Sequence, residues 1–166
     1  MEKYKVTSET IEIGSHVLHR VKALRSFSDV KEGDLGGFIE SEYNLSHSNN
    51  CWVYKEGRVF GNARVCEDAL VFENAQVFGN ALVCEDALVC EDARVFGNAL
   101  VDGNARIYGE AYLTGYISVS GNARVCGTAK IGGNTRVDSS IWNKTIQIKN
   151  TCYIISTTLK KLKCYY

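Results

Sequence analysis

The chain has 166 residues, which is enough for one domain with a continuous core. Its 19 basic and 19 acidic residues give a formal net charge of zero, so bulk charge indicates neither direct nucleic-acid binding nor a membrane surface. No apolar run approaches the ~20 residues of a membrane span, and the charged start lacks a signal-peptide core. Because the seven cysteines form no CxxC pair, we expect reduced thiols in a cytoplasmic protein without a metal site.

Residues 1–52 are predicted to form an N-terminal β cap. Residues 3–6, 10–13 and 16–21 alternate between polar and apolar side chains like the strands of a meander, and residues 33–39 form a turn-rich bridge. A solenoid needs such a cap because its first coil would otherwise expose its core and an unpaired strand edge.

Residues 53–142 repeat the hexad Val-x-x-x-Ala-x. A stronger period of eighteen lies over it, since residues 61–78 and 79–96 are identical at fourteen of eighteen positions. Three hexads per turn are typical of a coil with three flat sides. We therefore predict an all-β fold, a single-stranded left-handed parallel β-helix of about five triangular coils. The chain contains no proline, so every backbone N–H can join a ladder.

The inward side chains are predicted to alternate between small and aliphatic. The Ala of one hexad and the following Val lie two residues apart, so they point to the same side of a strand. Such pairs fit a narrow triangular core. Turns such as Gly61-Asn62 lie between them, because Gly and Asn tolerate left-handed backbone angles. We expect the stacked amides of Asn62, Asn80 and Asn98 to bond to one another.

The outward residues fall on three faces, and the third face is apolar over its first rungs. Soluble monomers seldom leave a contiguous apolar patch beyond a few hundred Å² in water. We therefore expect a contact surface, most simply a homo-oligomer interface; the alternative is that the ladder only stiffens the coil. The predicted interface residues are Trp52, Tyr54, Leu70, Phe72, Leu88, Cys90 and Tyr108.

The turns at the other two corners, away from the asparagine ladder, are acidic. Like charges one rung apart repel, and later turns use Gly-Asn instead, so nothing in the repeat requires the acids. They are predicted to form a ladder that binds a basic partner; the alternatives are a solvated edge and a weak calcium site. The ladder comprises Glu67, Asp68, Glu73, Glu85, Asp86, Glu91 and Asp92.

Residues 143–166 are predicted to form a C-terminal cap or tail. The segment carries five lysines and no acid, and residues 146–155 alternate like strand positions. Besides capping the coil, it has two alternative roles: head-to-tail stacking on the acidic first coils, and binding of a polyanion.

Four segments carry a resemblance to a known family. They are residues 21–27, 33–40, 44–47 and 51–54, and they lead into the Gly-Asn-Ala hexads. Together they resemble hexapeptide-repeat proteins that are frequent in bacteriophages and prophages and are often labelled acyltransferase-like. The resemblance covers about residues 15–140. It implies a cytoplasmic left-handed β-helix, often of phage origin, with no settled activity across the family.

An enzymatic role would follow from the wider class of hexapeptide acyltransferases, which are trimers that bind acyl-coenzyme A and use a histidine as general base. General-base chemistry needs a group that titrates near neutral pH beside the substrate. The histidines His16, His19 and His47 lie outside the coils, and the hexads run without an inserted loop. Only His47, at the junction of cap and coil, is a candidate base, and a capping hydrogen bond is its alternative role.

We therefore predict no catalytic residue and no cofactor, and interpret the chain as a non-catalytic protein-binding module. If the source is a phage, a natural role is to occlude a basic host protein such as a nucleic-acid enzyme, in the manner of an anti-CRISPR inhibitor. A rigid ladder supplies a preorganised surface with little ordering cost on binding. Two alternatives remain open: a trimeric acyltransferase that uses acyl-coenzyme A, and a self-assembling structural protein.

Overall fold

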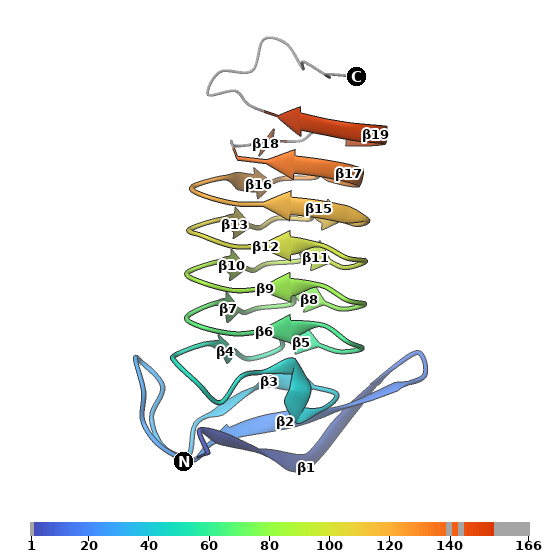
Figure 1. Cartoon of the computed structure of the whole chain (residues 1–166). Coiled ribbons are helices and arrows are strands. Elements are labelled where there is room, and N and C mark those ends of the chain that lie inside the picture. Colours follow the sequence, from blue (N-terminus) through green and yellow to red (C-terminus); the bar gives the residue numbers. More distant parts are fainter. Residues whose placement is uncertain (1, 139–140, 143–144, 155–166) are drawn as a thin grey trace.

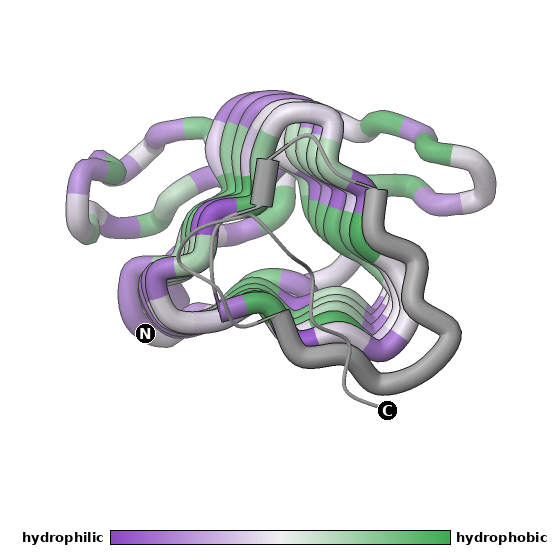
Figure 2. The backbone as a smooth tube through the Cα atoms, turned by 90° about the horizontal axis from the view of Figure 1, so that it is seen from above, coloured by the Kyte–Doolittle hydropathy of each residue, from purple (hydrophilic) through white to green (hydrophobic). Residues whose placement is uncertain are grey.

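The computed structural model describes residues 2–138, 141–142 and 145–154. The chain folds into a parallel β-solenoid with a cap at its N-terminal end (Figure 1). Viewed along the axis, the successive coils superimpose as a three-sided outline, and segments of the cap project beyond it (Figure 2). No helix in the described residues is long and apolar enough to cross a membrane.

The cap is a three-stranded sheet that continues directly into the solenoid. β1 (Tyr4–Ile13) pairs antiparallel with β2 (His16–Ala23), and β2 pairs antiparallel with β3 (Leu35–Ile39). The pattern predicted two strands where the structure has β1 alone, interrupted by a register shift between Val6 and Thr10. β3 pairs in parallel with β5 (Arg58–Val59), so the first coil adds to an existing strand and leaves no open edge there.

Each coil contributes one short strand to each of three faces. The first face contains β5, β8 (Gln76–Val77), β11 (Arg94–Val95), β14 (Tyr112–Leu113) and the start of β17 (Lys130–Val137). The second face contains β6 (Arg64–Val65), β9 (Leu82–Val83), β12 (Leu100–Val101), β15 (Tyr116–Val119) and the end of β17. The third face contains β4 (Trp52–Val53), β7 (Leu70–Val71), β10 (Leu88–Val89), β13 (Arg106–Ile107), β16 (Arg124–Cys126) and β18 (Ile141–Trp142).

The eighteen-residue period of the sequence sets the register in which the strands of successive coils pair. Strands one turn apart pair in parallel at this spacing, as in Trp52 with Leu70 and Leu70 with Leu88. The prediction of a parallel solenoid is therefore confirmed. In the described residues the third face has six strands, which span five periods of eighteen from Trp52 to Trp142, and β19 (Thr145–Ile154) pairs in parallel with β17 beyond them. Residues 155–166, which hold three lysines of the predicted tail, lie outside the described residues.

The core is a continuous column of small and aliphatic side chains that stack along the axis of the solenoid. Every repeat Ala and Val between residues 59 and 125 is at most 1% exposed. Ile107, Leu113 and Ile131 take the aliphatic position in the later coils, Ile117 replaces an Ala at the small position, and all four are at most 1% exposed. Fully burying one such side chain contributes roughly 1.5–3 kcal/mol, so the repeat itself supplies the apolar burial that holds each coil to the next.

The corner between the first and second faces is built from glycine and asparagine. Its glycines adopt left-handed backbone angles. The side-chain amide of Asn62 donates to Asn80 Oδ1 at 3.1 Å, and that of Asn80 donates to Asn98 Oδ1 at 3.1 Å. The predicted amide ladder is therefore confirmed, and it has a structural role.

Candidate functional site

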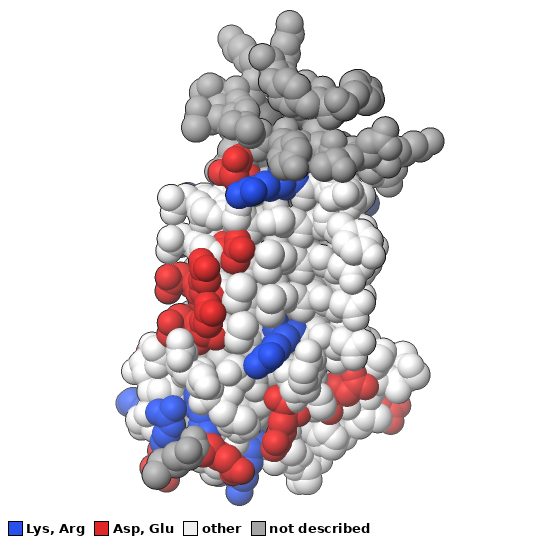
Figure 3. Space-filling model, viewed as in Figure 1, with Lys and Arg blue, Asp and Glu red and all other residues white. Residues whose placement is uncertain are grey.

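The third face lies between the two acidic corners. The chain enters β7 from the corner that holds Glu67 and Asp68, and it leaves β7 into the corner that holds Glu73. The same order recurs one coil later at β10. Figure 3 shows a column of acidic side chains along the left edge, over the turns that lead from β6 to β7 and from β9 to β10. The apolar face and the acidic ladder, which are separate features in the sequence, therefore form one surface.

Six of the seven predicted contact residues are partly exposed on this surface. The seventh, Trp52, is only 1% exposed because the cap covers it. The rings of Tyr4 and Phe27 pack edge-on against Trp52, with centroid distances of 6.1 and 5.3 Å. Trp52 therefore anchors the cap and does not face solvent, which corrects its expected place on an open contact surface. The partly exposed residues are Tyr54, Leu70, Phe72, Leu88, Cys90 and Tyr108.

A cavity of about 270 Å³ opens beside β4 and β7, where a cap loop meets the first coil. The rings of Tyr54 and Phe72 form an apolar wall, edge to face, with a centroid distance of 6.4 Å. The Tyr54 hydroxyl donates to the carboxylate of Asp29. Burial and then this contact raise the pKa of Tyr54 above its ordinary value. The rest of the lining comprises Lys55, Leu70 and Glu73.

The acidic corners have a structural role that the repeat pattern does not reveal. Glu67, Glu73 and Glu85 have φ of +58° to +59°, a left-handed angle that is costly for a residue with a Cβ atom. Each carboxylate accepts a hydrogen bond from the backbone N–H one coil further on: Glu67 from Glu85, Glu73 from Glu91, and Glu85 from Gly103, at 2.8–2.9 Å. Such charge-assisted bonds offset the strained angle. The expectation that nothing in the coil requires these acids is therefore wrong.

The aspartates of the same corners also bond along the ladder. Asp68 Oδ1 accepts a hydrogen bond from Asn50 Nδ2 at 2.8 Å, and Asp92 Oδ1 accepts one from Asn74 Nδ2 at 3.2 Å. Asp86 is exposed. The hydrogen-bond partners of these aspartates are amides rather than cations. The negative charge of both acidic corners, which form the two borders of the third face, is therefore directed to solvent. Among the described residues, no group of three or more His, Cys, Asp or Glu side chains is arranged to hold a metal ion.

The thiols on the outer faces are poor nucleophiles. Cys66, Cys84 and Cys90 are partly buried and form no disulfide. Burial raises the pKa of Cys84 to about 12 and that of Cys90 to about 11. Because the thiolate is the nucleophilic form of cysteine, these side chains are unsuited to covalent catalysis at neutral pH.

His47, the candidate base in the sequence, is a capping partner in the structure. Its Nδ1 accepts a hydrogen bond from the backbone N–H of Lys3 at 3.2 Å. Its ring stacks on Tyr4, with a centroid distance of 4.2 Å and an angle of 9° between the ring planes. Both contacts tie the start of the chain to the junction of cap and coil.

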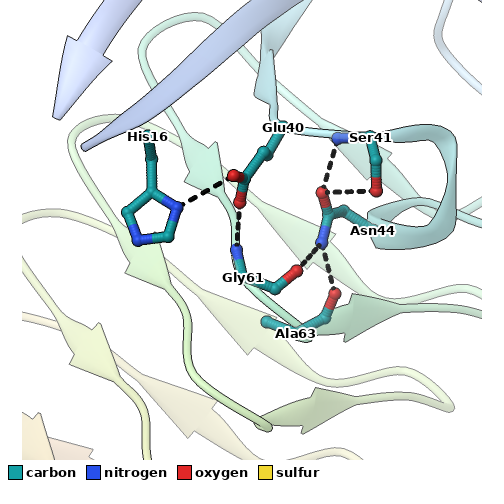
Figure 4. A network of polar contacts seen from close by, with 6 residues as sticks. All are labelled: His16, Glu40, Ser41, Asn44, Gly61 and Ala63. Atoms are coloured by element: carbon teal, nitrogen blue, oxygen red, sulfur yellow. Dashed lines mark hydrogen bonds and ion pairs between the residues drawn. The ribbon is translucent and has the colours of Figure 1, made fainter.

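His16 forms a dyad with Glu40 that no motif in the sequence signals (Figure 4). Its Nδ1 lies 2.9 Å from Glu40 Oε1, and Glu40 Oε2 accepts a hydrogen bond from the backbone N–H of Gly61 at 2.6 Å. The His16 side chain is 38% exposed and packs beside the ring of Phe60. The dyad orients the imidazole and leaves Nε2 outside the contact with Glu40. Its two members are 24 positions apart, so only the folded cap brings them together.

The same junction is fastened by the short 3₁₀ helix η1 (Glu42–Asn44). Asn44 is buried, and its side-chain amide donates to the carbonyl oxygens of Gly61 and Ala63 at 3.0 and 2.8 Å. Its Oδ1 accepts a hydrogen bond from the backbone N–H of Ser41 at 2.8 Å (Figure 4). The dyad therefore lies within a polar network that holds the cap against the first glycine corner.

Acidification is expected to weaken this junction through Glu40. Hydrogen bonds from His16 and then from Gly61 hold the pKa of Glu40 below its ordinary value of 4.5. A carboxyl group with a lowered folded-state pKa contributes stability above its unfolded pKa and loses it as the pH falls through the folded pKa. Urea unfolding at pH 7 should therefore find the wild type more stable than Glu40→Gln, with a difference that shrinks below about pH 4. A difference that is constant with pH would contradict this role.

A short segment of the chain is similar to a known protein. No family model matches the chain. Over 48 residues the chain is 38% identical to the "Uncharacterized acetyltransferase YdcK" of Escherichia coli strain K12. The match covers 28% of this chain and 15% of the length of that protein. Together with the three-sided hexad coil, this similarity fits the hexapeptide-repeat class of β-solenoid proteins.

Proposed function

We propose that this protein is a non-catalytic binding module that holds a basic, amphipathic segment of a partner protein against the third face. The observation that carries the proposal is the position of the apolar strands β7 and β10 between two acidic corners. Protein interfaces commonly have an apolar centre and a polar rim. A rim of one sign favours a partner of the opposite sign and speeds its approach.

The homo-oligomer expected from the sequence fits this surface less well. A second copy packed face to face would bring its acidic borders next to those of the first copy. Like charges placed against each other across an interface cost several kcal/mol. A basic partner avoids this cost, whereas self-association would have to use the first or second face.

The resemblance to phage and prophage proteins gives the proposal a biological setting. A rigid surface with acidic borders is suited to occlude the basic groove of a host nucleic-acid enzyme, because the ladder is ordered before binding and loses little entropy. An anti-CRISPR inhibitor in the host cytoplasm is one form that this role takes. The phage origin, the host target and the location all belong to the proposal.

The charges of the borders provide the test. In Glu73→Gln/Glu85→Gln/Glu91→Gln, each glutamine keeps an acceptor oxygen for the ladder and removes one charge. Three exposed charges at roughly 0.5 kcal/mol each should weaken binding of a captured partner about tenfold in Kd. Captures from host lysate with the wild type and the variant, followed by titration of the purified partner, measure this change.

A matched control removes the same charge elsewhere. Glu2, Glu12 and Glu32 lie exposed in the cap, and their change to Gln should leave the affinity within twofold of the wild type, or about 0.4 kcal/mol. Equal loss of affinity in both variants would attribute binding to net charge alone.

A wild-type oligomer that Leu70→Glu/Leu88→Glu converts to monomer in light scattering would assign the third face to self-association. Growth into long particles would favour the structural alternative.

A second function, acyl transfer, is favoured by two observations. They are the short match to an uncharacterised acetyltransferase and the orientation of His16 by Glu40, which is how general bases are commonly held. His16 does not line the cavity described on the third face. Calorimetry with acetyl-coenzyme A distinguishes the two functions, because the binding module has no affinity for it and a transferase binds it.

A further inference from the structure

A buried lysine and a buried cysteine meet where the start of the chain enters the solenoid. Lys3 Nζ lies 3.2 Å from Cys51 Sγ, and both residues are 0% exposed. Nζ also donates to the carbonyl oxygen of Cys51 at 2.8 Å and to those of Ser48 and Asn49 at 3.4 Å. The pair is therefore held in place by contacts that do not depend on the thiol.

The surroundings of the pair favour its uncharged forms. Within the described part of the chain, every hydrogen-bond acceptor that Nζ contacts is a carbonyl oxygen or the thiol, with no carboxylate among them. Burial is the main cause that lowers the pKa of Lys3 and raises the pKa of Cys51. An amine and a thiol in contact are both oxidisable groups, and neither takes part in the third face or in the His16–Glu40 dyad.

We propose that Lys3 and Cys51 form a site of oxidative modification, at which hydrogen peroxide inserts one oxygen atom between Nζ and Sγ as a covalent N–O–S bridge. One peroxide oxidises the sulfur by two electrons, converting the thiol to sulfenic acid and releasing water. A second peroxide oxidises the free amine by two electrons to a hydroxylamine and also releases water. Condensation of the two groups forms the O–S bond and expels a third water. The product has one oxygen more and two hydrogens fewer than the reduced pair.

The geometry suits this product because the two atoms are already in contact and need no backbone movement to share one oxygen. The cover over the pair is thin, since Glu2, Ser48, Asn49 and Asn50 are exposed. A peroxide molecule can therefore enter when the turn at residues 48–50 opens locally. The bridge would join residue 3 to residue 51 and restrict the unfolded chain, as cross-links do. Its effect is to lock the cap onto the first coil.

The experiment uses the full chain with Cys51 as its only cysteine, the other six being changed to Ser or Ala. The protein is incubated with hydrogen peroxide at mildly alkaline pH, where more of the thiolate and the free amine is present. We expect the intact mass to gain one oxygen and lose two hydrogens, and peptide mapping to join the peptides of Lys3 and Cys51. Dithiothreitol should reverse the change, and the oxidised protein should melt at a higher temperature than the reduced protein.

Two control variants separate the bridge from simple thiol oxidation. Lys3→Arg keeps a long basic side chain at the site but cannot form the hydroxylamine, and Cys51→Ala removes the sulfur. Both should lack the mass change and the rise in melting temperature. The proposal is overturned if Cys51 proceeds to sulfinic acid without a link to Lys3, if Cys51 stays reduced, or if Lys3→Arg shows the same mass change as the parent.

Discussion

Trp52→Ala is expected to lower the free energy of unfolding by about 3–5 kcal/mol, the usual cost of truncating a fully buried aromatic side chain. The indole fills the space between the cap and the first coil, in contact with the rings of Tyr4 and Phe27. A Cβ atom added at Gly36 would come within 2.7 Å of this indole, which shows how closely the cap backbone approaches it. Its removal should therefore open a cavity that the rigid coil cannot close.

Leu70→Ala is the matched control, because Leu70 pairs with Trp52 in the third-face ladder but is partly exposed. Its truncation should cost less than half as much stability. The free energy of unfolding of both variants is measured by urea unfolding. Backbone circular dichroism is the signal, because it does not rely on the tryptophan that Trp52→Ala removes. An equal loss of stability in the two variants, or a loss below about 1 kcal/mol in Trp52→Ala, would contradict the role of Trp52 as an anchor of the cap.

The glycine corner should show a graded response to alanine. Gly61, Gly79 and Gly97 share a left-handed φ of +65° to +74°. An added Cβ would lie 3.3 Å from the backbone of the next coil at Gly61, 3.0 Å at Gly79 and 2.7 Å at Gly97. The angle alone costs about 1–2 kcal/mol, and the closest approach adds about 1–3 kcal/mol of overpacking. The loss of stability should therefore increase from Gly61→Ala to Gly97→Ala.

The three glycine variants isolate the effect of the distance between the added Cβ atom and the backbone of the next coil, because φ changes little among the three positions. Thermal and urea unfolding of the three single variants would give the order directly. Equal destabilisation at all three positions would mean that the angle alone requires glycine there. The corners with glutamate at the same angle show that the coil accepts a Cβ atom where the spacing permits it.

The solenoid was predictable from the sequence because its determinants are local and periodic. Ala and Val at fixed positions of each hexad specify which side chains point into the core. The period of eighteen specifies which strands pair, as Leu70 with Leu88 illustrates. The pairing of β19 with β17 does not follow from the repeat, because the residues of β19 no longer keep the hexad. The role of the glutamates was missed because a side chain that bonds to the backbone eighteen positions later leaves no mark in the composition of its own turn.

The sequence by itself determined the fold, the register and the identity of the outward residues, since each follows from a repeat that every coil satisfies with its neighbours. Only the tertiary structure decided how those residues combine. It placed the apolar face between the acidic corners, covered Trp52 with the cap, and brought His16 to Glu40 and Lys3 to Cys51. These contacts lie within the aperiodic cap or where it meets the periodic coil, and their distances depend on how the chain folds back rather than on any spacing along it.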